Sequence, residues 1–163
     1  MAYDCYLKLE GIDGESTDSK HKDWIEVLSF NTGVDQGGSS HSGGGASTTG
    51  RANFADFTIT KYFDKSTPKL SLFCAQGEHI KSAKIEMCQA TKEKNCYMRY
   101  TLGDVLVSSV RPSGSSGDDR ALPVEEVTMR YQKIEWEYTP MDAAGKPVAA
   151  QKAVWDLKTN LKG

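Results

Sequence analysis

The sequence predicts a mainly β protein, in which antiparallel strands form a single-domain barrel or sandwich and one α-helix, over about residues 65–76, lies against them. Apolar and polar residues alternate along most of the chain, which is typical of half-buried strands. The alternation changes parity after Leu102 and again near Gln132, and such slips favour long strands that bend or bulge. Only one segment combines helix-capping residues with the apolar spacing of a helix.

The first strands come from the N-terminal third of the chain. Alternation from Tyr3 to Leu9 predicts a strand that ends at Gly11, and a second strand is predicted from Trp24 to Gly33. Residues 57–63 alternate threonine and lysine with apolar and aromatic side chains, so they predict a third half-buried strand.

The predicted helix follows this third strand at once. Ser66 or Thr67 is expected to accept hydrogen bonds from the free N–H groups of the first turn. Pro68 suits the first turn because its missing N–H has no partner there, and Gly77 can adopt the left-handed conformation that ends a helix.

The remaining strands are predicted from the same alternation. They cover residues 83–88, 98–102 with a continuation through Val105 and Val107, 127–131, 134–138 and 153–157. Because the pattern resumes on the other parity near Gln132, a bulge or strong bend is expected there.

Composition limits the class of protein. A chain of 163 residues with 38% hydrophobic residues fits one globular domain over 1–163. A net charge of -2 with scattered basic residues excludes the basic surface that binds nucleic acid or an anionic membrane. The start of the chain lacks the features of a signal peptide and no apolar run could span a bilayer, so we expect cytosolic synthesis and no membrane insertion.

Cysteines and histidines give no sign of a metal or cofactor site. The four cysteines, Cys5, Cys74, Cys88 and Cys96, lack C-x-x-C spacing, so buried free thiols are expected rather than ligands or disulfides. The three histidines are expected at the surface, because none has the helical spacing or surrounding acids of a zinc site: His21, His41 and His79. No nucleophile elbow or other catalytic set is present, so the chain is not expected to be an enzyme.

Residues 33–50 form an extended Gly/Ser-rich segment that is expected to be a loop. Gly45 to Gly50 matches the first half of a phosphate-binding loop, but Arg51 and Ala52 replace the lysine and hydroxyl residue that such loops need. Two interpretations remain, a flexible linker or a segment ordered by contact with a partner.

Several segments together carry a family resemblance. They are residues 2–16, 25–30, 57–68, 78–79, 105–110 and 155–158. Across them the chain resembles Hcp, the haemolysin-coregulated protein family of type VI secretion systems. The resemblance implies a phage tail-tube-like fold, homohexameric rings that stack into a secretion tube, and no catalytic function. It also implies the VgrG spike, the contractile sheath and effector proteins as partners, with secretion on sheath contraction and without a cleaved signal peptide.

The resemblance also indicates interaction residues. The family's loop after the second strand lies at the ring face and contributes to stacking, which carries onto Gln36, Ser39, Ser40, His41 and Ser42. In the second strand Ser29 and Asn31 share a parity that Phe30 does not. We hypothesise that Ser29 and Asn31 face the lumen of the tube, where small polar groups let unrelated cargo bind weakly.

Two other functions remain open on the sequence alone. A β-barrel that binds a small ligand would need a cavity in its interior instead of a filled core. A hydrolase would need two carboxyl groups that converge in a cleft.

Overall fold

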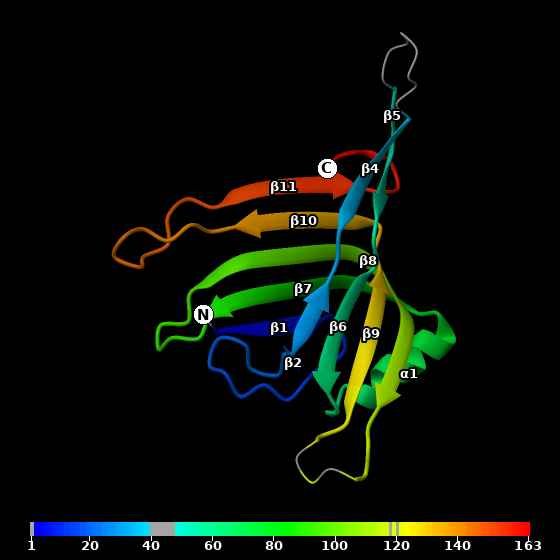
Figure 1. The fold of residues 1–163 in the computed structure, drawn as a ribbon, viewed down its shortest axis with the longest axis vertical. Coiled ribbons are helices and arrows are strands. Elements are labelled where there is room, and N and C mark those ends of the chain that lie inside the picture. The colour runs from blue at the N-terminus through cyan, green and yellow to red at the C-terminus, as the bar shows by residue number, and fades with distance from the viewer. Residues whose placement is uncertain (1, 40–47, 118, 120) are drawn as a thin grey trace.

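The computed structural model describes residues 2–39, 48–117, 119 and 121–163, and its described part is mainly β with one helix (Figure 1). The strands are β1 (Tyr3–Leu9), β2 (Ile25–Val27), β3 (Ser29–Asn31), β4 (Val34–Ser39), β5 (Thr48–Phe54), β6 (Phe57–Tyr62), β7 (His79–Gln89), β8 (Cys96–Ser113), β9 (Val124–Arg130), β10 (Lys133–Tyr138), β11 (Gln151–Asp156) and β12 (Leu161–Lys162). The helix α1 spans Thr67–Gln76. No described helix is long and apolar enough to cross a membrane.

The long strand β8 joins two groups of strands. One group has the order β12-β11-β10-β8-β7-β1-β2, and in the other β8 pairs with β9, β9 with β6 and β6 with β3. All of these pairings are antiparallel. Figure 1 shows β6 and β9 running across the direction of β7, β10 and β11. The predicted mainly β, antiparallel fold class is therefore confirmed.

Both parity slips in the sequence fall where β8 changes partners. β8 pairs with β10 as far as Gly103, and from Leu106 it pairs with β9. Between them Asp104 has a positive φ of 51°. The second slip lies between the end of β9 and the start of β10, where the backbone N–H of Gln132 donates to the carbonyl of Gly103 at 3.0 Å. One bend in the architecture thus explains both irregularities in the pattern.

The core fills the space between the two groups of strands. Its buried side chains form one cluster that includes Phe57, Ile85, Leu102 and Met129, which are all fully buried. The helix α1 packs against β8 and contributes Leu70 to this cluster. The interior is thus filled mainly with apolar side chains, as expected when burial of apolar area drives folding.

The helix agrees with its prediction except at the N-terminal cap. Gly77 ends it in the left-handed conformation, with φ 64°. Ser66 occupies the cap position, but its side chain makes no capping hydrogen bond, and its hydroxyl donates instead to the carboxylate of Asp64. The hydroxyl of Thr67 accepts from the backbone N–H of Asp64 at 3.1 Å, outside the first helical turn. The predicted cap is therefore wrong, because Asp64 competes for these hydroxyl groups.

The predicted loop over residues 33–50 is wrong in its two arms. β4 and β5 pair as a separate two-stranded antiparallel sheet with a register shift between Gln36 and Gly38. We call β4 and β5 together the hairpin, and Figure 1 shows it extending away from the rest of the molecule. Residues 33–37 are exposed, so this arm has no buried face and its sequence lacks the apolar alternation that reveals a strand.

Candidate functional site

The hairpin depends on glycine at one of its cross-strand contacts. The side-chain amide of Gln36 donates to the carbonyl of Gly50, and a Cβ at Gly50 would lie 2.8 Å from the carbonyl oxygen of Gly37. A Cβ at Gly37 itself would meet nothing within 4 Å. The two arms thus approach too closely at Gly50 for a larger residue.

The predicted stacking residues lie on or beyond this hairpin. Gln36 is exposed on β4 and Ser39 is the last residue of that strand. Ser40, His41 and Ser42 lie outside the described residues.

The predicted lumen residues lie on one face of β3. Ser29 and Asn31 are exposed, whereas Phe30 packs against the core, with its ring centroid 6.0 Å from that of Phe57. This is the division of parity that the sequence predicts for the strand, although it does not test contact with cargo.

Polar side chains continue from β3 across three further strands. On β6, Thr60 and Thr58 stand opposite Ser29 and Asn31, and the pairing continues through β9 to β8. We call this set the polar sheet face; its members are Ser29, Asn31, Thr58, Thr60, Glu126, Thr128, Ser109 and Arg111. All are exposed or half-buried, and the hydroxyls of Thr58 and Thr128 lie 3.3 Å apart. Such a face offers hydrogen bonds without a large apolar surface.

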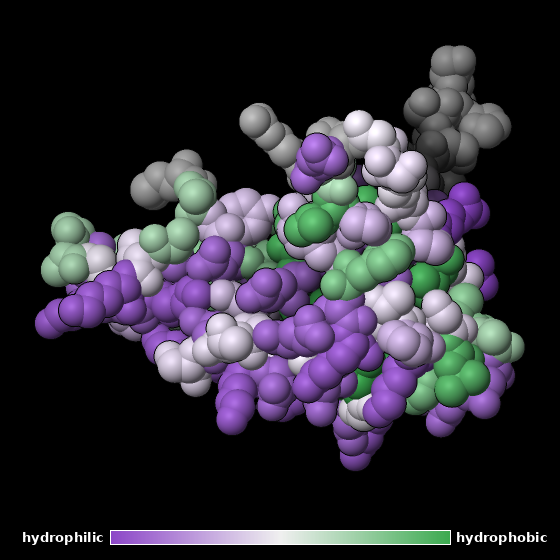
Figure 2. All heavy atoms as spheres, turned by 90° about the horizontal axis from the view of Figure 1, so that it is seen from below, coloured by the Kyte–Doolittle hydropathy of each residue, from purple (hydrophilic) through white to green (hydrophobic). Residues whose placement is uncertain are grey.

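The end of the molecule opposite to the hairpin is seen from below in Figure 2. Hydrophilic side chains cover most of it, and hydrophobic ones gather in smaller patches between them. The exposed large hydrophobic residues of the chain include Leu28, Tyr62, Phe63, Leu72 and Leu122.

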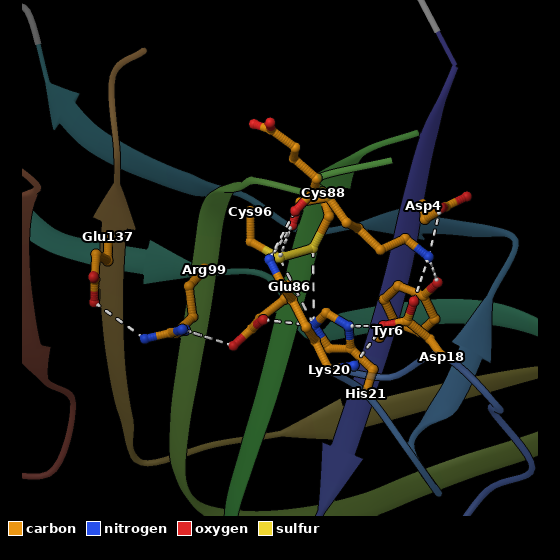
Figure 3. Close-up of polar contacts among 12 residues, drawn as sticks. Asp4, Tyr6, Asp18, Lys20, His21, Glu86, Cys88, Cys96, Arg99 and Glu137 are labelled. Carbon is orange, nitrogen blue, oxygen red and sulfur yellow. Dashed lines mark hydrogen bonds and ion pairs between the residues drawn. A yellow bond between two sulfur atoms is a disulfide. The ribbon is translucent and has the colours of Figure 1, made fainter. Parts of the chain in front are cut away.

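His21 contradicts the prediction of a surface histidine. Its side chain is only 2% exposed, and its two ring nitrogens lie between two carboxylates (Figure 3). Nδ1 lies 2.7 Å from Oδ1 of Asp18, and Nε2 lies 2.8 Å from Oε2 of Glu86. Asp18 is close to His21 in the sequence, but Glu86 is not. Glu86 stands opposite Tyr6 in the pairing of β1 with β7, and Tyr6 stacks on His21. Sequence reasoning therefore missed this group.

The cysteine prediction is wrong for one pair. Cys88 and Cys96 form a disulfide at the end of the β7–β8 pairing, where they stand opposite each other. Cys5 is a buried free thiol, as predicted, and burial raises its pKa to about 12, whereas Cys74 is free but only half-buried. The signal that could have found the disulfide is the polar run between residues 90 and 95, which marks a turn between two strands.

Comparison with known proteins decides the family. The family model described as "Type VI secretion system effector, Hcp" matches residues 6–138. The chain belongs to the Hcp family. Protein hcp1 of Pseudomonas aeruginosa is 39% identical to it over 164 residues, which cover 99% of each chain. This Hcp chain is thus a type VI secretion tube protein of a structural, secreted family that is not an enzyme family.

Solved structures agree with this assignment. One described as "Structure of a type six secretion system protein" has a TM-score of 0.93 at 36% identity and covers 99% of this chain and 100% of its own. Hcp1 from Salmonella typhimurium has a TM-score of 0.82 at 35% identity, with 100% of each chain covered. A chain in the baseplate of the anti-feeding prophage shares the fold alone, with a TM-score of 0.52, 8% identity and coverage of 82% and 91%.

Proposed function

We propose that residues 1–163 act as one tube domain that forms homohexameric rings, and that these rings stack into the inner tube of a type VI secretion system. In this proposal the tube carries effector proteins, contacts the VgrG spike and the contractile sheath, and leaves the cytoplasm on contraction without a cleaved signal peptide. Support comes from the family and from relatives that match along nearly the whole chain.

The hairpin is the observation that best supports stacking. It extends from the body of the subunit (Figure 1), and the described residues from 33 to 37 are exposed on it. An ordered, projecting pair of strands with little contact to its own subunit is suited to bind a neighbouring copy. We therefore propose that the hairpin bridges successive rings, with Gln36, Ser39, Ser40, His41 and Ser42 among the contacting residues.

The polar sheet face is the proposed lumen wall. Hydroxyl and amide groups can exchange hydrogen bonds with water at little cost, so cargo that contacts Ser29 and Asn31 would bind weakly and leave again. The lack of large apolar groups among its members favours tolerance of unrelated cargo over tight selection.

A glycine pair tests the stacking role. Gly50→Ala places a Cβ 2.8 Å from the Gly37 carbonyl, whereas Gly37→Ala points into open space. We expect Gly50→Ala to form single rings that no longer lengthen into tubes, and Gly37→Ala to behave as the unchanged protein. Negative-stain imaging and mass photometry over a concentration range measure both. Tubes of normal length from Gly50→Ala would refute the stacking role, and a wild-type protein that stays monomeric would refute the ring.

A second pair tests the lumen role. Asn31→Gln alters the polar sheet face, and Asn53→Gln makes the same change on the exposed arm of the hairpin. We expect only Asn31→Gln to change the amount of effector that copurifies with the protein. Equal retention by both variants would refute the assignment of Asn31.

A further inference from the structure

Four residues of types that bind metals meet at the end of the β7–β8 pairing. The ligand atoms of His21, Glu86, Cys88 and Cys96 all lie within 4.8 Å of one another. His21 Nε2 is 3.9 Å from the sulfur of Cys88 and 3.8 Å from that of Cys96. Three of the four residues are buried and Cys96 is half-buried. Figure 3 shows the imidazole, the carboxylate and the sulfur atoms converging on one point.

We propose that reduction of the Cys88–Cys96 disulfide converts this cluster into a Zn²⁺ site, with His21 Nε2, the Glu86 carboxylate and the two cysteine thiolates as ligands. Zinc in proteins is held tetrahedrally by these residue types. With zinc–sulfur and zinc–nitrogen bonds of about 2.3 and 2.0 Å, neighbouring ligand atoms stand roughly 3.3 to 3.8 Å apart. The nitrogen–sulfur distances in the structure are already close to this range, and reduction frees the two sulfur atoms to separate.

The side chains of Asp18 and Tyr6 hold the His21 ring in an orientation that suits metal binding. Nδ1 of His21 is held by the Asp18 carboxylate at 2.7 Å, which directs Nε2 toward the two sulfur atoms. A carboxylate on the far nitrogen of a histidine fixes the ring and strengthens it as a zinc ligand. The other oxygen of the Asp18 carboxylate accepts from the ammonium group of Lys94 at 2.8 Å, which holds the carboxylate in place. Tyr6 stacks on the imidazole with centroids 4.3 Å apart, which further restricts the ring.

The second carboxylate is also partly fixed. Oε1 of Glu86 accepts from Nε of Arg99 at 2.8 Å, while Oε2 faces His21. Oε2 can therefore move from the histidine to a metal while the Arg99 contact is kept. Arg99 and Lys94 supply positive charge near the two thiolates and two carboxylates, which lowers the electrostatic cost of collecting these ligands.

The conversion of the disulfide into the zinc site balances in electrons and protons. A thiol reductant of the glutathione or dithiol class gives two electrons and two protons to the disulfide, which breaks the S–S bond and leaves two cysteine thiols and the oxidised reductant. Zn²⁺ then displaces the thiol protons and any proton on His21 Nε2 into solvent. Reoxidation by a disulfide oxidant re-forms the Cys88–Cys96 bond and releases the ion.

The cluster is accessible to an ion from solvent. A surface pocket of about 360 Å³ is lined by His21, Glu86, Cys96 and Arg99, together with residues that include Met141 and Pro147. A metal site needs such an entry path as well as suitable ligands. The half-buried Cys96 is the thiol nearest to that path and is also the one that a reductant would reach.

Zinc binding by the full-length chain tests the proposal. The protein is reduced with a phosphine that does not bind zinc, and Zn²⁺ is titrated in competition with a chromophoric chelator. We expect one tightly bound Zn²⁺ per reduced chain, and affinity weaker by on the order of 100-fold in the oxidised chain or in Cys96→Ser, since thiolate ligands are lost. Cys74→Ser removes a half-buried thiol outside the cluster and is the matched control. Asp18→Asn should weaken binding by about 10- to 100-fold through the histidine.

Alkylation of the wild-type protein tests the same site without relying on variants, which could fail to fold. Reduced protein is alkylated with and without Zn²⁺, and the labelled peptides are quantified by mass spectrometry. Selective protection of Cys88 and Cys96, with Cys74 labelled equally in both samples, supports the site. Equal zinc affinity of the reduced and oxidised chains, or labelling of Cys88 and Cys96 that zinc does not change, would overturn it.

Discussion

Lys61 is a buried cation whose removal gives a quantitative test of how the subunit is stabilised. Its side chain is 0% exposed, and its ammonium group contacts the carboxylate of Glu125, which is 1% exposed. The two residues are cross-strand partners on β6 and β9. Nζ of Lys61 also lies 3.0 Å from Oδ1 of Asp64 and 3.4 Å from the hydroxyl of Thr67, so it links the sheet to the start of α1.

The expected cost follows from what Lys61→Met leaves behind. Methionine fills a similar volume, but Glu125 would remain buried, with the Thr67 hydroxyl at 2.8 Å as its remaining donor among the described residues. Breaking a buried ion pair in this way costs about 3–5 kcal/mol of unfolding free energy. The double variant Lys61→Met/Glu125→Gln removes both charges and keeps an acceptor for Thr67. We expect it to regain most of the loss, because replacing both members of a buried pair is often nearly neutral.

The control makes the same substitution in an exposed ion pair. Lys65 and Asp23 lie 3.9 Å apart and are each 52% exposed, so Lys65→Met should cost less than about 1 kcal/mol. Urea denaturation measures all variants at one protein concentration, with light scattering to establish that their oligomeric states match. A Lys61→Met cost as small as that of Lys65→Met would refute the argument. So would a double variant as unstable as Lys61→Met alone.

Three further predictions concern other parts of the chain. Gly14→Ala should lower the unfolding free energy, measured by urea denaturation, by about 1–3 kcal/mol or more, because its Cβ would lie 2.4 Å from a backbone carbonyl oxygen. Gly33→Ala is the control and should leave the unfolding free energy unchanged, because its Cβ meets nothing within 4 Å. Equal losses in the two variants would contradict this. In metal-free buffer, reducing Cys88–Cys96 or introducing Cys96→Ser should lower the unfolding free energy by about 2.5 kcal/mol for a loop closed over 8 residues; an unchanged midpoint would count against it. The pKa of Asp18 lies at about 2, below its ordinary 3.8, because hydrogen bonds outweigh burial. Its stabilising contribution is therefore present above pH 4 and lost as pH falls toward 2, and Asp18→Asn should flatten unfolding free energy over that window.

The sequence predicts most strands of the body because most of them have one buried face. β6 shows this most clearly, since its buried and half-buried residues alternate from Phe57 to Lys61. The two parity slips even locate the bend at Gly103. The single strand expected from Trp24 to Gly33 is instead two short strands, since β2 pairs with β1 and β3 with β6, and the exposed two-residue strand β12 was not predicted.

The β4 arm of the hairpin was not predictable in this way, because its described side chains have no buried face and backbone pairing alone gives no apolar pattern. On β5 the half-buried Ala52 and Phe54 do alternate with exposed residues, but this run is too short to indicate a strand.

The buried polar groups were hidden from sequence analysis for another reason. His21 and Glu86 look like ordinary members of a polar loop and of a solvated strand face. Lys61 and Glu125 share the parity of the buried residues in their strands, but their charge argues for exposure unless an opposite charge is known to face them. Their burial depends on partners 64 and 65 residues away, which only the register of β6 with β9 and of β1 with β7 brings together. A pattern within one strand gives the face on which a residue lies, but not the charge that stands opposite.

Polar groups of this Hcp chain fall into two sets with different physical consequences. The buried set is paired within the subunit, as at Lys61 and His21, so changes there should lower the unfolding free energy. The second set lies on the hairpin and the polar sheet face and is exposed or half-buried in the subunit, so changes at its exposed members, such as Ser29, Asn31 and Gln36, cost little stability. If rings and tubes form through the second set, assembly can be altered by substitution without loss of the fold. A tube subunit has to keep its own structure while its contacts with other chains form and break, and this separation of the two sets allows that.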